Sequence, residues 1–309
     1  MTEVSFHHVP VMLNPCLEAL AIKPGGIYVD GTMGGAGHSS EIVKRLSGGR
    51  LIGFDRDPAA IAASQKKLAD FGDTVTYVNR NHAEVKDALA SLGVPAIDGA
   101  LLDLGVSSHQ LDEPERGFSY RFDAPLDMRM DSEAELSAYQ VVNEYSEQQL
   151  AKVIFEYGED KNARKIARRI VENRPIKTTL ELVDVIKSAF SAKERQEKHP
   201  AKRTFQAIRI EVNNELDMLG GAIERLAEKL NKGGRLCIIT FHSLEDRIVK
   251  NTFNELSKGC TCPKDFPVCV CGNKERFKVV TRKPVLPSAK ELEENPRSAS
   301  AKLRVLERI

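Results

Sequence analysis

The sequence predicts an α/β fold in which a largely parallel sheet is wound with helices and interrupted by a helical insertion. In the first third of the chain, short β-rich runs alternate with helical patterns, which is typical of a parallel sheet. No convincing strand follows between about residues 110 and 206, and the alternation then resumes. We therefore predict the first part of an α/β domain at 1–109, an inserted helical domain at 110–206 and the second part of the α/β domain at 207–309.

The first third contains consecutive strand and helix patterns. Asp57 and Pro58 give one helix a good N-cap and a good first-turn residue. The expected strands are 27–30, 51–55, 74–79 and 99–103, and the expected helices between them are 38–46, 58–70 and 84–92.

The middle segment is expected to be helical and strongly basic. Residues 161–209 contain 14 Lys and Arg against 5 Asp and Glu. Such a surface can attract phosphates, although a solvated helical face is the favoured interpretation of a lone basic run. One amphipathic helix is expected where apolar residues recur at helical spacing opposite the basic ones, at Ala163, Ile166, Ala167, Ile170 and Val171. A second amphipathic helix is expected at 180–190.

The final third returns to the α/β pattern. A long helix is expected at 205–230, ended by a glycine pair, and a strand at 235–241. Ser243 and Asp246 resemble a capping box that opens the next helix. A loop rich in Pro and Glu at 284–297 and a last strand at 300–308 complete the chain.

The composition is ordinary for a globular protein. The 309 residues are 41% hydrophobic and 29% charged, with a net charge of +1, so the chain as a whole is not a binder of polyanions. No apolar run approaches the roughly 18 residues of a membrane span. The first residues do not resemble a secretory signal, so we expect a cytoplasmic location.

A glycine-rich turn follows the first strand and is the best indication of a cofactor site. The strand ends in Asp30, and Gly31, Gly34 and Gly37 precede a helix. Later strands end in Asp55 and Asp103, the first of which is placed to accept hydrogen bonds from ribose hydroxyls.

The carboxylates around this turn favour one class of cofactor. A dinucleotide would place its pyrophosphate beside them and be repelled, whereas S-adenosylmethionine carries a positive sulfonium and ammonium. S-adenosylmethionine is therefore favoured over NAD, although a single Asp is often only an N-cap. A nicotinamide-dependent oxidoreductase and a non-catalytic RNA-binding factor remain as alternatives.

The chain resembles a specific family, the bacterial 16S rRNA (cytosine-N4) methyltransferases of the MraW type. The resemblance extends over nearly the full length and keeps the order of the family's motifs. The motifs are His8-Val-Pro-Val, Asp30-Gly-Thr-Met-Gly-Gly-Ala-Gly-His38-Ser, Asp55-Arg-Asp-Pro58, Leu102-Asp-Leu-Gly-Val-Ser-Ser108, Arg116-Gly-Phe-Ser, Pro125-Leu-Asp-Met-Arg-Met-Asp131, His199-Pro-Ala-Lys-Arg-Thr-Phe-Gln-Ala207, Phe241-His-Ser-Leu-Glu-Asp-Arg247 and Asn295-Pro-Arg-Ser-Ala-Ser.

This resemblance implies a class I (Rossmann-like) methyltransferase sheet with an inserted helical domain that recognises the substrate. It implies methyl transfer from S-adenosylmethionine to N4 of a cytidine in the decoding centre, the P-site region, of 16S rRNA. The expected partner is 16S rRNA within the small ribosomal subunit, and a homodimer is possible. No metal is expected at the active site. The cofactor contacts carried over are Ala36, Gly37, His38, Asp55, His82, Asp103 and Gln110.

Asp103 is also the candidate catalytic residue. It could accept a proton from the cytosine N4, or serve only to bind the cofactor. The chain lacks the Pro-Pro-aromatic motif that DNA amino-methyltransferases place here, so the N4 target depends on the resemblance.

Other residues could contact the RNA. Phe118, Tyr120 and Phe122 could stack on a base, although a half-buried extended segment is slightly favoured. A structural role is favoured for His242. Possible phosphate contacts are Lys202, Arg203 and Arg209.

Four cysteines near the C-terminus form two closely spaced C-x-C pairs. They are Cys260, Cys262, Cys269 and Cys271. A structural zinc site and a reduced surface loop are both consistent with this spacing, which is tighter than the common C-x-x-C knuckle. The other two cysteines, Cys16 and Cys237, are expected in the core.

Overall fold

The protein is described here by a computed structural model covering residues 10–107, 110–111, 113–197, 199–260, 262, 268 and 271–309. The chain divides into two compact units, one formed by Met1–Gly105 with Leu216–Ile309 and the other by Val106–Glu215. The second unit extends beyond the residues 110–206 expected for the insertion. At its C-terminal end this is because the apolar side of its last helix belongs to its core. Among the described residues, no helix combines the length and the apolar character needed to cross a membrane.

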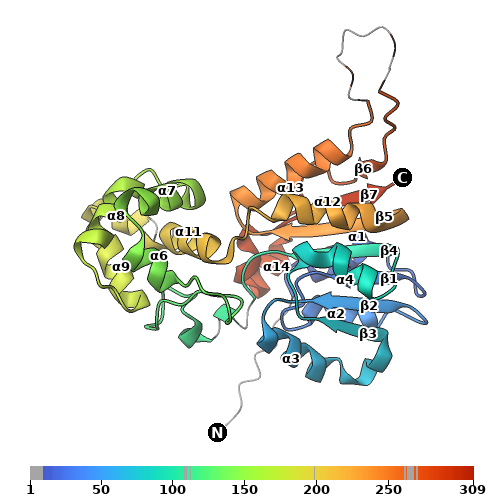
Figure 1. Cartoon of the computed structure of the whole chain (residues 1–309), viewed down its shortest axis with the longest axis horizontal. Coiled ribbons are helices and arrows are strands. Elements are labelled where there is room, and N and C mark those ends of the chain that lie inside the picture. Colours follow the sequence, from blue (N-terminus) through green and yellow to red (C-terminus); the bar gives the residue numbers. More distant parts are fainter. Residues whose placement is uncertain are drawn as a thin grey trace. The chain divides into compact units, whose positions relative to one another are not determined.

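The first unit is built on a sheet of seven strands in the order β3-β2-β1-β4-β5-β7-β6 (Figure 1). The five strands β1 to β5 run parallel, and β7 lies antiparallel between β5 and β6. The α/β prediction is therefore confirmed. The strands are β1 (Ile27–Asp30), β2 (Arg50–Phe54), β3 (Val75–Val78), β4 (Ile97–Asp103), β5 (Leu230–Thr240), β6 (Phe277–Val279) and β7 (Lys302–Arg308).

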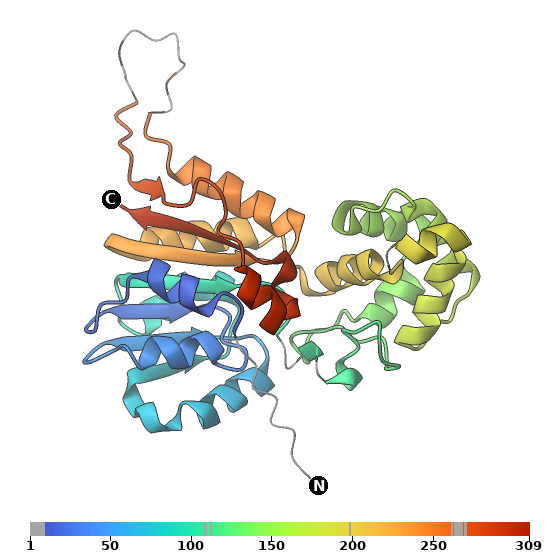
Figure 2. The ribbon, with the colours of Figure 1, turned by 180° about the vertical axis from the view of Figure 1, so that it is seen from behind.

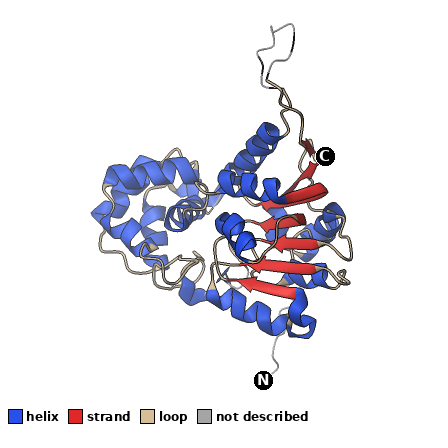
Figure 3. Ribbon diagram, turned by 45° about the vertical axis from the view of Figure 1, so that its right-hand side comes forward, coloured by secondary structure: helices blue, strands red, loops and turns tan. Residues whose placement is uncertain are grey.

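Helices cover both faces of this sheet, as Figure 3 shows. One face packs under α4, α12 and α13, which lie in front of the sheet in Figure 1. The other face packs under α1 and α2, which Figure 2 shows from behind. The helices are α1 (Leu13–Leu20), α2 (Gly37–Val43), α3 (Pro58–Lys67), α4 (Val85–Ser91), α12 (Leu219–Lys229), α13 (Ser243–Leu256) and α14 (Ala289–Glu294).

Successive residues of the central strands alternate between these two cores. Val29 and Leu102 pack with α12 and α13, whereas Tyr28 and Leu101 pack with α1 and α2. All four are buried, because a strand with helices on both sides has no solvent face. This explains why the strands read as continuous apolar runs rather than as alternating ones.

The second unit is helical, and its described part contains only an isolated bridge, between Pro125 and Thr178, in place of regular strands. The helix α8 buries the Ala and Ile side chains that the spacing predicts and exposes its basic residues. Phe205, Ile208 and Val212 of α11 join the same core, which extends the unit beyond residue 206. The helices are α6 (Ala138–Glu144), α7 (Glu147–Gly158), α8 (Ala163–Glu172), α9 (Thr179–Ser188), α10 (Ala192–Glu197) and α11 (Ala201–Asn213).

Two expectations about the last third were wrong. The long helix expected at 205–230 is two helices, because Asn214 takes a left-handed conformation with φ 47° and ends α11. The segment 284–297 is not wholly a loop, because it contains α14. Ser288 starts that helix by accepting a hydrogen bond from the Glu291 backbone N–H at 3.1 Å.

Candidate cofactor and catalytic site

The candidate site lies at the carboxyl ends of the central strands. The strand order reverses between β1 and β4, because the chain winds from β1 towards β3 on one side and from β4 towards β5 on the other. Ligands of open parallel sheets bind at such a switch point. Asp30 ends β1, Asp103 ends β4 and Asp55 follows β2, so the sheet brings the three predicted carboxylates to one edge.

The glycine turn between β1 and α2 requires its glycines for steric reasons. A Cβ added at Gly31 would lie 2.3 Å from Cδ2 of Leu102, so β4 leaves no room for a side chain. Gly34 has a φ of 49°, which costs glycine little. Above Gly35, an added Cβ would meet nothing within 4 Å. The turn is therefore packed tightly against β4 at Gly31 and open at Gly35.

Asp30 supports the turn from beneath and does not face a ligand. It is 1% exposed, and its carboxylate accepts hydrogen bonds from the Ser39 hydroxyl at 2.6 Å and the Thr32 backbone N–H at 3.2 Å. Burial raises the pKa of Asp30 to about 6, against the lowering effect of both hydrogen bonds. From the sequence we expected Asp30 to face the ligand together with Asp55 and Asp103. In the structure its hydrogen bonds instead hold the turn in place.

Asp55 connects the turn to β2 and keeps capacity for a ligand. One carboxylate oxygen accepts from the Gly34 N–H at 2.8 Å and the other from the Asp57 N–H at 2.9 Å. An ionised carboxylate offers about four acceptor sites, so about two remain. Burial raises the pKa of Asp55 in spite of these bonds. Two ribose hydroxyls would fit the remaining acceptor sites.

Asp103 carries the clearest sign of a missing partner. Its backbone N–H donates to Oγ1 of Thr32 at 2.6 Å, and Oδ2 lies 3.7 Å from Nδ1 of His38. Its Oδ1 is buried without a hydrogen-bond partner among the described residues, although 26% of the whole side chain is exposed. An orphaned buried carboxylate oxygen is rare and needs an explanation.

The electrostatics of Asp103 indicate what the missing partner is. Burial, followed by the charges of Asp30 and Glu245, raises the pKa of Asp103 well above its usual value. A bound cation would reverse this effect by stabilising the carboxylate. S-adenosylmethionine carries two positive groups, so the residues fit this cofactor. It supplies an electrophilic methyl group when bound.

The other predicted contacts surround this carboxylate or the turn. Ala36 is buried in a left-handed conformation, with φ 54°, and precedes α2. A Cβ on Gly37 would lie 2.4 Å from Cγ of Pro10, so the helix must begin with glycine. His38 is 6% exposed, and its Nε2 lies 3.1 Å from the Val11 carbonyl oxygen. That contact orients Nδ1 towards Asp103.

His82 follows β3 and lies against the turn. A Cβ on Gly31 would approach Cβ of His82 to 3.1 Å. Burial lowers the pKa of His82 to about 4, and the cations Arg56 and Arg225 lower it further. The ring is therefore neutral at pH 7, as required for stacking on an adenine without the desolvation of a charge.

Gln110 belongs to the second unit. It is buried, its Oε1 accepts from the Ser107 N–H at 3.1 Å, and its own N–H donates to the Ser107 hydroxyl at 3.2 Å. Its contact with the cofactor stays a prediction.

The sequence analysis missed the residues of α3 that hold the turn. The Ser64 hydroxyl donates to the Gly34 carbonyl at 2.9 Å, and Nζ of Lys67 donates to the Gly35 carbonyl at 2.9 Å. Their spacing of three places them on one side of α3. Nothing local in the sequence shows that this side packs under the turn.

The start of α13 differs from the expectation. The N-cap is His242, whose Nδ1 accepts from the Glu245 N–H at 3.4 Å, while Glu245 accepts from the His242 N–H at 3.3 Å. The box thus lies one residue earlier than Ser243–Asp246, because His242 has the extended backbone of an N-cap. Asp246 instead pairs with Arg304 at 2.6 Å.

His242 also borders a hollow beside the end of β5. Its buried Nε2 lies 3.1 Å from Oε1 of Glu245, at an angle that makes no hydrogen bond. The hollow has a volume of about 350 Å³, at the lower end of small-molecule sites. Its lining residues include Phe241, His242, Ser243, Leu286, Ala301 and Lys302.

Some of the residues expected to contact RNA are exposed, and others already contact residues of the second unit. Phe118 is 7% exposed and belongs to the core, whereas Tyr120 is half-buried, packs against that core and stacks on His199 with ring centroids 4.4 Å apart. Phe122 is 51% exposed. Arg209 binds both carboxylate oxygens of Glu215, at 2.8 and 2.9 Å, so its guanidinium is paired within the second unit, and its phosphate contact stays a prediction. Lys202 and Arg203 are exposed.

Comparisons with known proteins identify the family of this chain. Residues 5–309 match the model of the MraW methylase family. The "Ribosomal RNA small subunit methyltransferase H" of Clostridioides difficile is 58% identical over 99% of this chain and 100% of its own length. Proteins with the same name from Brevibacillus brevis and Clostridium botulinum are each 56% identical, over 100% and 99% of this chain and 100% of their own lengths. A solved putative rRNA methylase from Clostridium thermocellum aligns over 98% of this chain and 100% of its own, with TM-score 0.47 and 13% identity.

The match covers the glycine turn, the strand-end carboxylates and the helical insertion alike. The chemistry of the candidate site is compatible with the cofactor of such a methylase. Asp103 would be stabilised by a cation, Asp55 keeps two acceptor sites, and the ring of His82 is neutral. The chain is therefore an enzyme that belongs to the MraW methylase family of S-adenosylmethionine-dependent methyltransferases.

Proposed function

We propose that this enzyme transfers a methyl group from S-adenosylmethionine to N4 of a cytidine in the decoding centre, the P-site region, of 16S rRNA. The observation that carries the proposal is the orphaned Oδ1 of Asp103 at the switch point. It supports a cationic methyl donor. The rRNA substrate is supported by the names of the full-length relatives, which are small-subunit rRNA methyltransferases.

We propose that the cofactor is held by Ala36, Gly37, His38, Asp55, His82, Asp103 and Gln110. Asp55 would accept the ribose hydroxyls with its two unused acceptor sites. His82 would stack on the adenine with its neutral ring. Asp103 would pair with the cationic end of the cofactor through Oδ1.

Asp103 is also our candidate for the catalytic proton acceptor. The lone pair of the cytosine N4 is delocalised into the ring, so this nitrogen is a weak nucleophile. A carboxylate that accepts an N4 hydrogen makes the lone pair more available and takes the proton as the N–C bond forms. A carboxylate has two oxygens, so Asp103 can perform this task and still bind the cofactor.

The RNA would be recognised partly by charge. Lys161, Arg164, Lys165, Arg168 and Arg169 are exposed on or beside α8, and Lys202 and Arg203 are exposed on α11. Phosphate contacts of this kind position an RNA without reading its sequence. A cytoplasmic location and the small ribosomal subunit as partner follow from this substrate. A homodimer remains a prediction, which sedimentation velocity would test.

The decisive experiment supplies labelled S-adenosylmethionine and the enzyme to small subunits from a strain that lacks the activity. The expected result is label on one cytidine of 16S rRNA, with mass spectrometry placing the methyl group on N4. The same reaction with free 16S rRNA tests whether the assembled subunit is needed. An absence of label on every cytidine in both reactions would refute the proposal.

Calorimetric titration separates this function from an oxidoreductase. We expect binding of S-adenosylhomocysteine and no binding of NADH, because carboxylates at the turn repel a pyrophosphate. Saturable binding of NADH would contradict the cofactor assignment. A non-catalytic RNA-binding factor would give RNA binding without label.

A further inference from the structure

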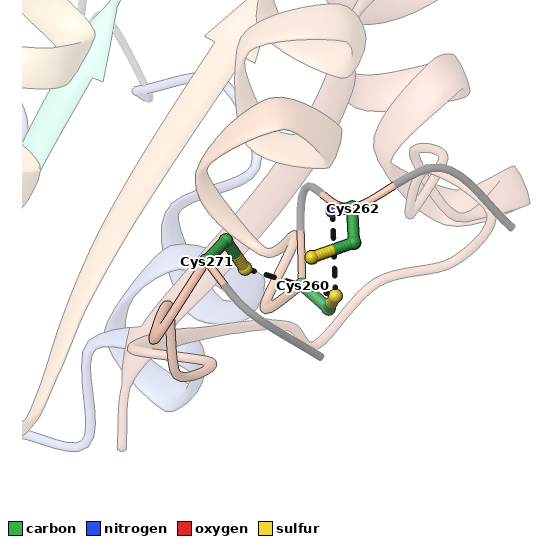
Figure 4. A group of neighbouring side chains, drawn as sticks. All are labelled: Cys260, Cys262 and Cys271. Carbon is green, nitrogen blue, oxygen red and sulfur yellow. Dashed lines mark hydrogen bonds between the residues drawn. The ribbon is translucent and has the colours of Figure 1, made fainter. Parts of the chain in front are cut away.

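Three cysteine side chains converge in the loop between α13 and β6. Figure 4 shows their side chains pointing toward one another. The Sγ atoms of Cys260, Cys262 and Cys271 all lie within 4.8 Å of one another. Sγ of Cys260 and Sγ of Cys271 are 3.7 Å apart. A disulfide needs about 2.05 Å, so these two atoms are close without being bonded to each other.

This separation is the one that a tetrahedral zinc ion imposes. With a Zn–S bond of about 2.3 Å and a tetrahedral angle, two thiolate sulfurs on one ion lie about 3.8 Å apart. The 3.7 Å between the Sγ atoms of Cys260 and Cys271 agrees with that value. Three sulfurs this close to one another leave room for a single ion, whereas a multinuclear iron–sulfur cluster needs some of its thiolates further apart.

The backbone around the cysteines has the features of a metal-binding turn. The Cys262 N–H donates to Sγ of Cys260 at 3.4 Å, an interaction that stabilises a thiolate. Gly272, directly after Cys271, has a φ of 65°, which allows a tight turn. An added Cβ at Gly259 would lie 3.1 Å from the backbone N of Glu275, so the two arms of the loop run in contact.

The described residues of this loop form no apolar core that could order it instead. It connects Leu256, the end of α13, to Phe277, the start of β6. A connection of about 20 residues between a helix and a strand is long for a compact domain, and long connections often have a function. None of the described residues from Ser257 to Arg276 is buried, and Val268 is 70% exposed. Burial of apolar surface therefore does not explain why the thiols converge.

We propose that Cys260, Cys262 and Cys271 bind one structural zinc ion that closes the loop between α13 and β6. The thiols bind as thiolates, so each releases a proton when the metal enters. A structural zinc site takes four protein ligands. The sequence offers the thiol of Cys269 for the fourth position, and this residue lies outside the described part of the chain. The site is independent of the proposed methyl transfer, because none of these residues belongs to the candidate active site.

The test begins with metal analysis of the full-length protein, purified without a polyhistidine tag from cells grown with zinc. We expect about one zinc per chain by mass spectrometry of the elements. Replacement by Co²⁺ should give thiolate-to-cobalt charge-transfer bands and the visible bands of a tetrahedral site. Both measurements use the wild-type chain, so they do not depend on the folding of a variant. Well under one zinc per chain together with absent cobalt bands would overturn the proposal, and so would iron in place of zinc.

The variants place the ion on these residues. The double variant Cys260→Ser and Cys271→Ser should lose the zinc, while Cys16→Ala, a thiol buried in the core of the first unit, should keep it. Cys269→Ser should weaken zinc binding at least tenfold in competition with a chelator, and unchanged affinity would refute the fourth ligand. Retention of the zinc by the double variant would refute the site itself. Binding of S-adenosylhomocysteine by the double variant serves as the check that the sheet is folded.

Discussion

Replacement of Asp103 by Asn tests the central assignment, because it removes the charge and keeps the shape. Oδ1 of Asp103 is buried without a hydrogen-bond partner in the part of the chain that the structure describes, and we assign the cationic end of the cofactor to it. A hydrogen bond to a charged group contributes about 1.5–3 kcal/mol. We therefore expect Asp103→Asn to weaken the binding of S-adenosylhomocysteine, which keeps the ammonium group, roughly 10- to 150-fold.

The same substitution should stabilise the protein without its cofactor. Burial and the nearby carboxylates raise the pKa of Asp103, so its ionised form opposes folding. The cost is absent below the unfolded value of about 3.9, grows as the pH rises and is complete above the folded pKa. At pH 8 we expect a higher melting temperature for Asp103→Asn than for the wild type. A lower affinity with a higher stability is the combination that a structural role for Asp103 would not give.

Calorimetry measures the affinity, differential scanning fluorimetry measures the stability, and Asp70→Asn, at an exposed carboxylate, is the matched control. The role of Asp103 in proton transfer is tested by measuring turnover at saturating cofactor. A base should lose kcat at saturation, whereas a residue that only binds the cofactor should recover kcat there. Binding within twofold of the wild type, with unchanged turnover, would refute both roles of Asp103.

Other substitutions test the turn and the RNA surface. Because burial raises the pKa of Asp30 to about 6, wild-type stability should fall relative to Asp30→Asn as the pH rises from about 4 through 6; parallel profiles in urea titrations across this range would contradict the assignment. Gly31→Ala places a methyl group 2.3 Å from Cδ2 of Leu102 and should lower the free energy of unfolding by about 1–3 kcal/mol. An unchanged urea midpoint would show that Leu102 of β4 can move aside. Replacing both Lys202 and Arg203 by Ala should weaken RNA binding and lower the slope of log K against log salt by up to about 2, and an unchanged slope would remove these residues from the RNA contact.

Local patterns were sufficient for many of the elements of this protein. The strands appear as short continuous apolar runs and α8 as apolar residues with a period of 3.6, both of which neighbouring residues in the sequence reveal. The cap at Asp57 is equally local, since its side chain accepts from the Ala59 N–H at 3.0 Å. Errors occurred where alternatives were locally equivalent. Asn214 ends a helix that the pattern would continue, and His242 takes the cap that Ser243 resembles.

The sequence by itself determined that a glycine turn follows a strand, that carboxylates end three strands and that four cysteines lie close together in the chain. Only the tertiary structure decided what each carboxylate does. It placed Asp30 under the turn and gave two of the acceptor sites of Asp55 to backbone N–H groups. It left one oxygen of Asp103 without a hydrogen-bond partner among the residues described. The physical reason is that burial and hydrogen bonding are sums over neighbours from distant parts of the chain, as the bond between Asp103 and Thr32 shows. The chemical type of a residue is known from the sequence. Its environment sets its pKa and the hydrogen-bonding sites that it has left for a ligand, and this environment exists only in the folded chain.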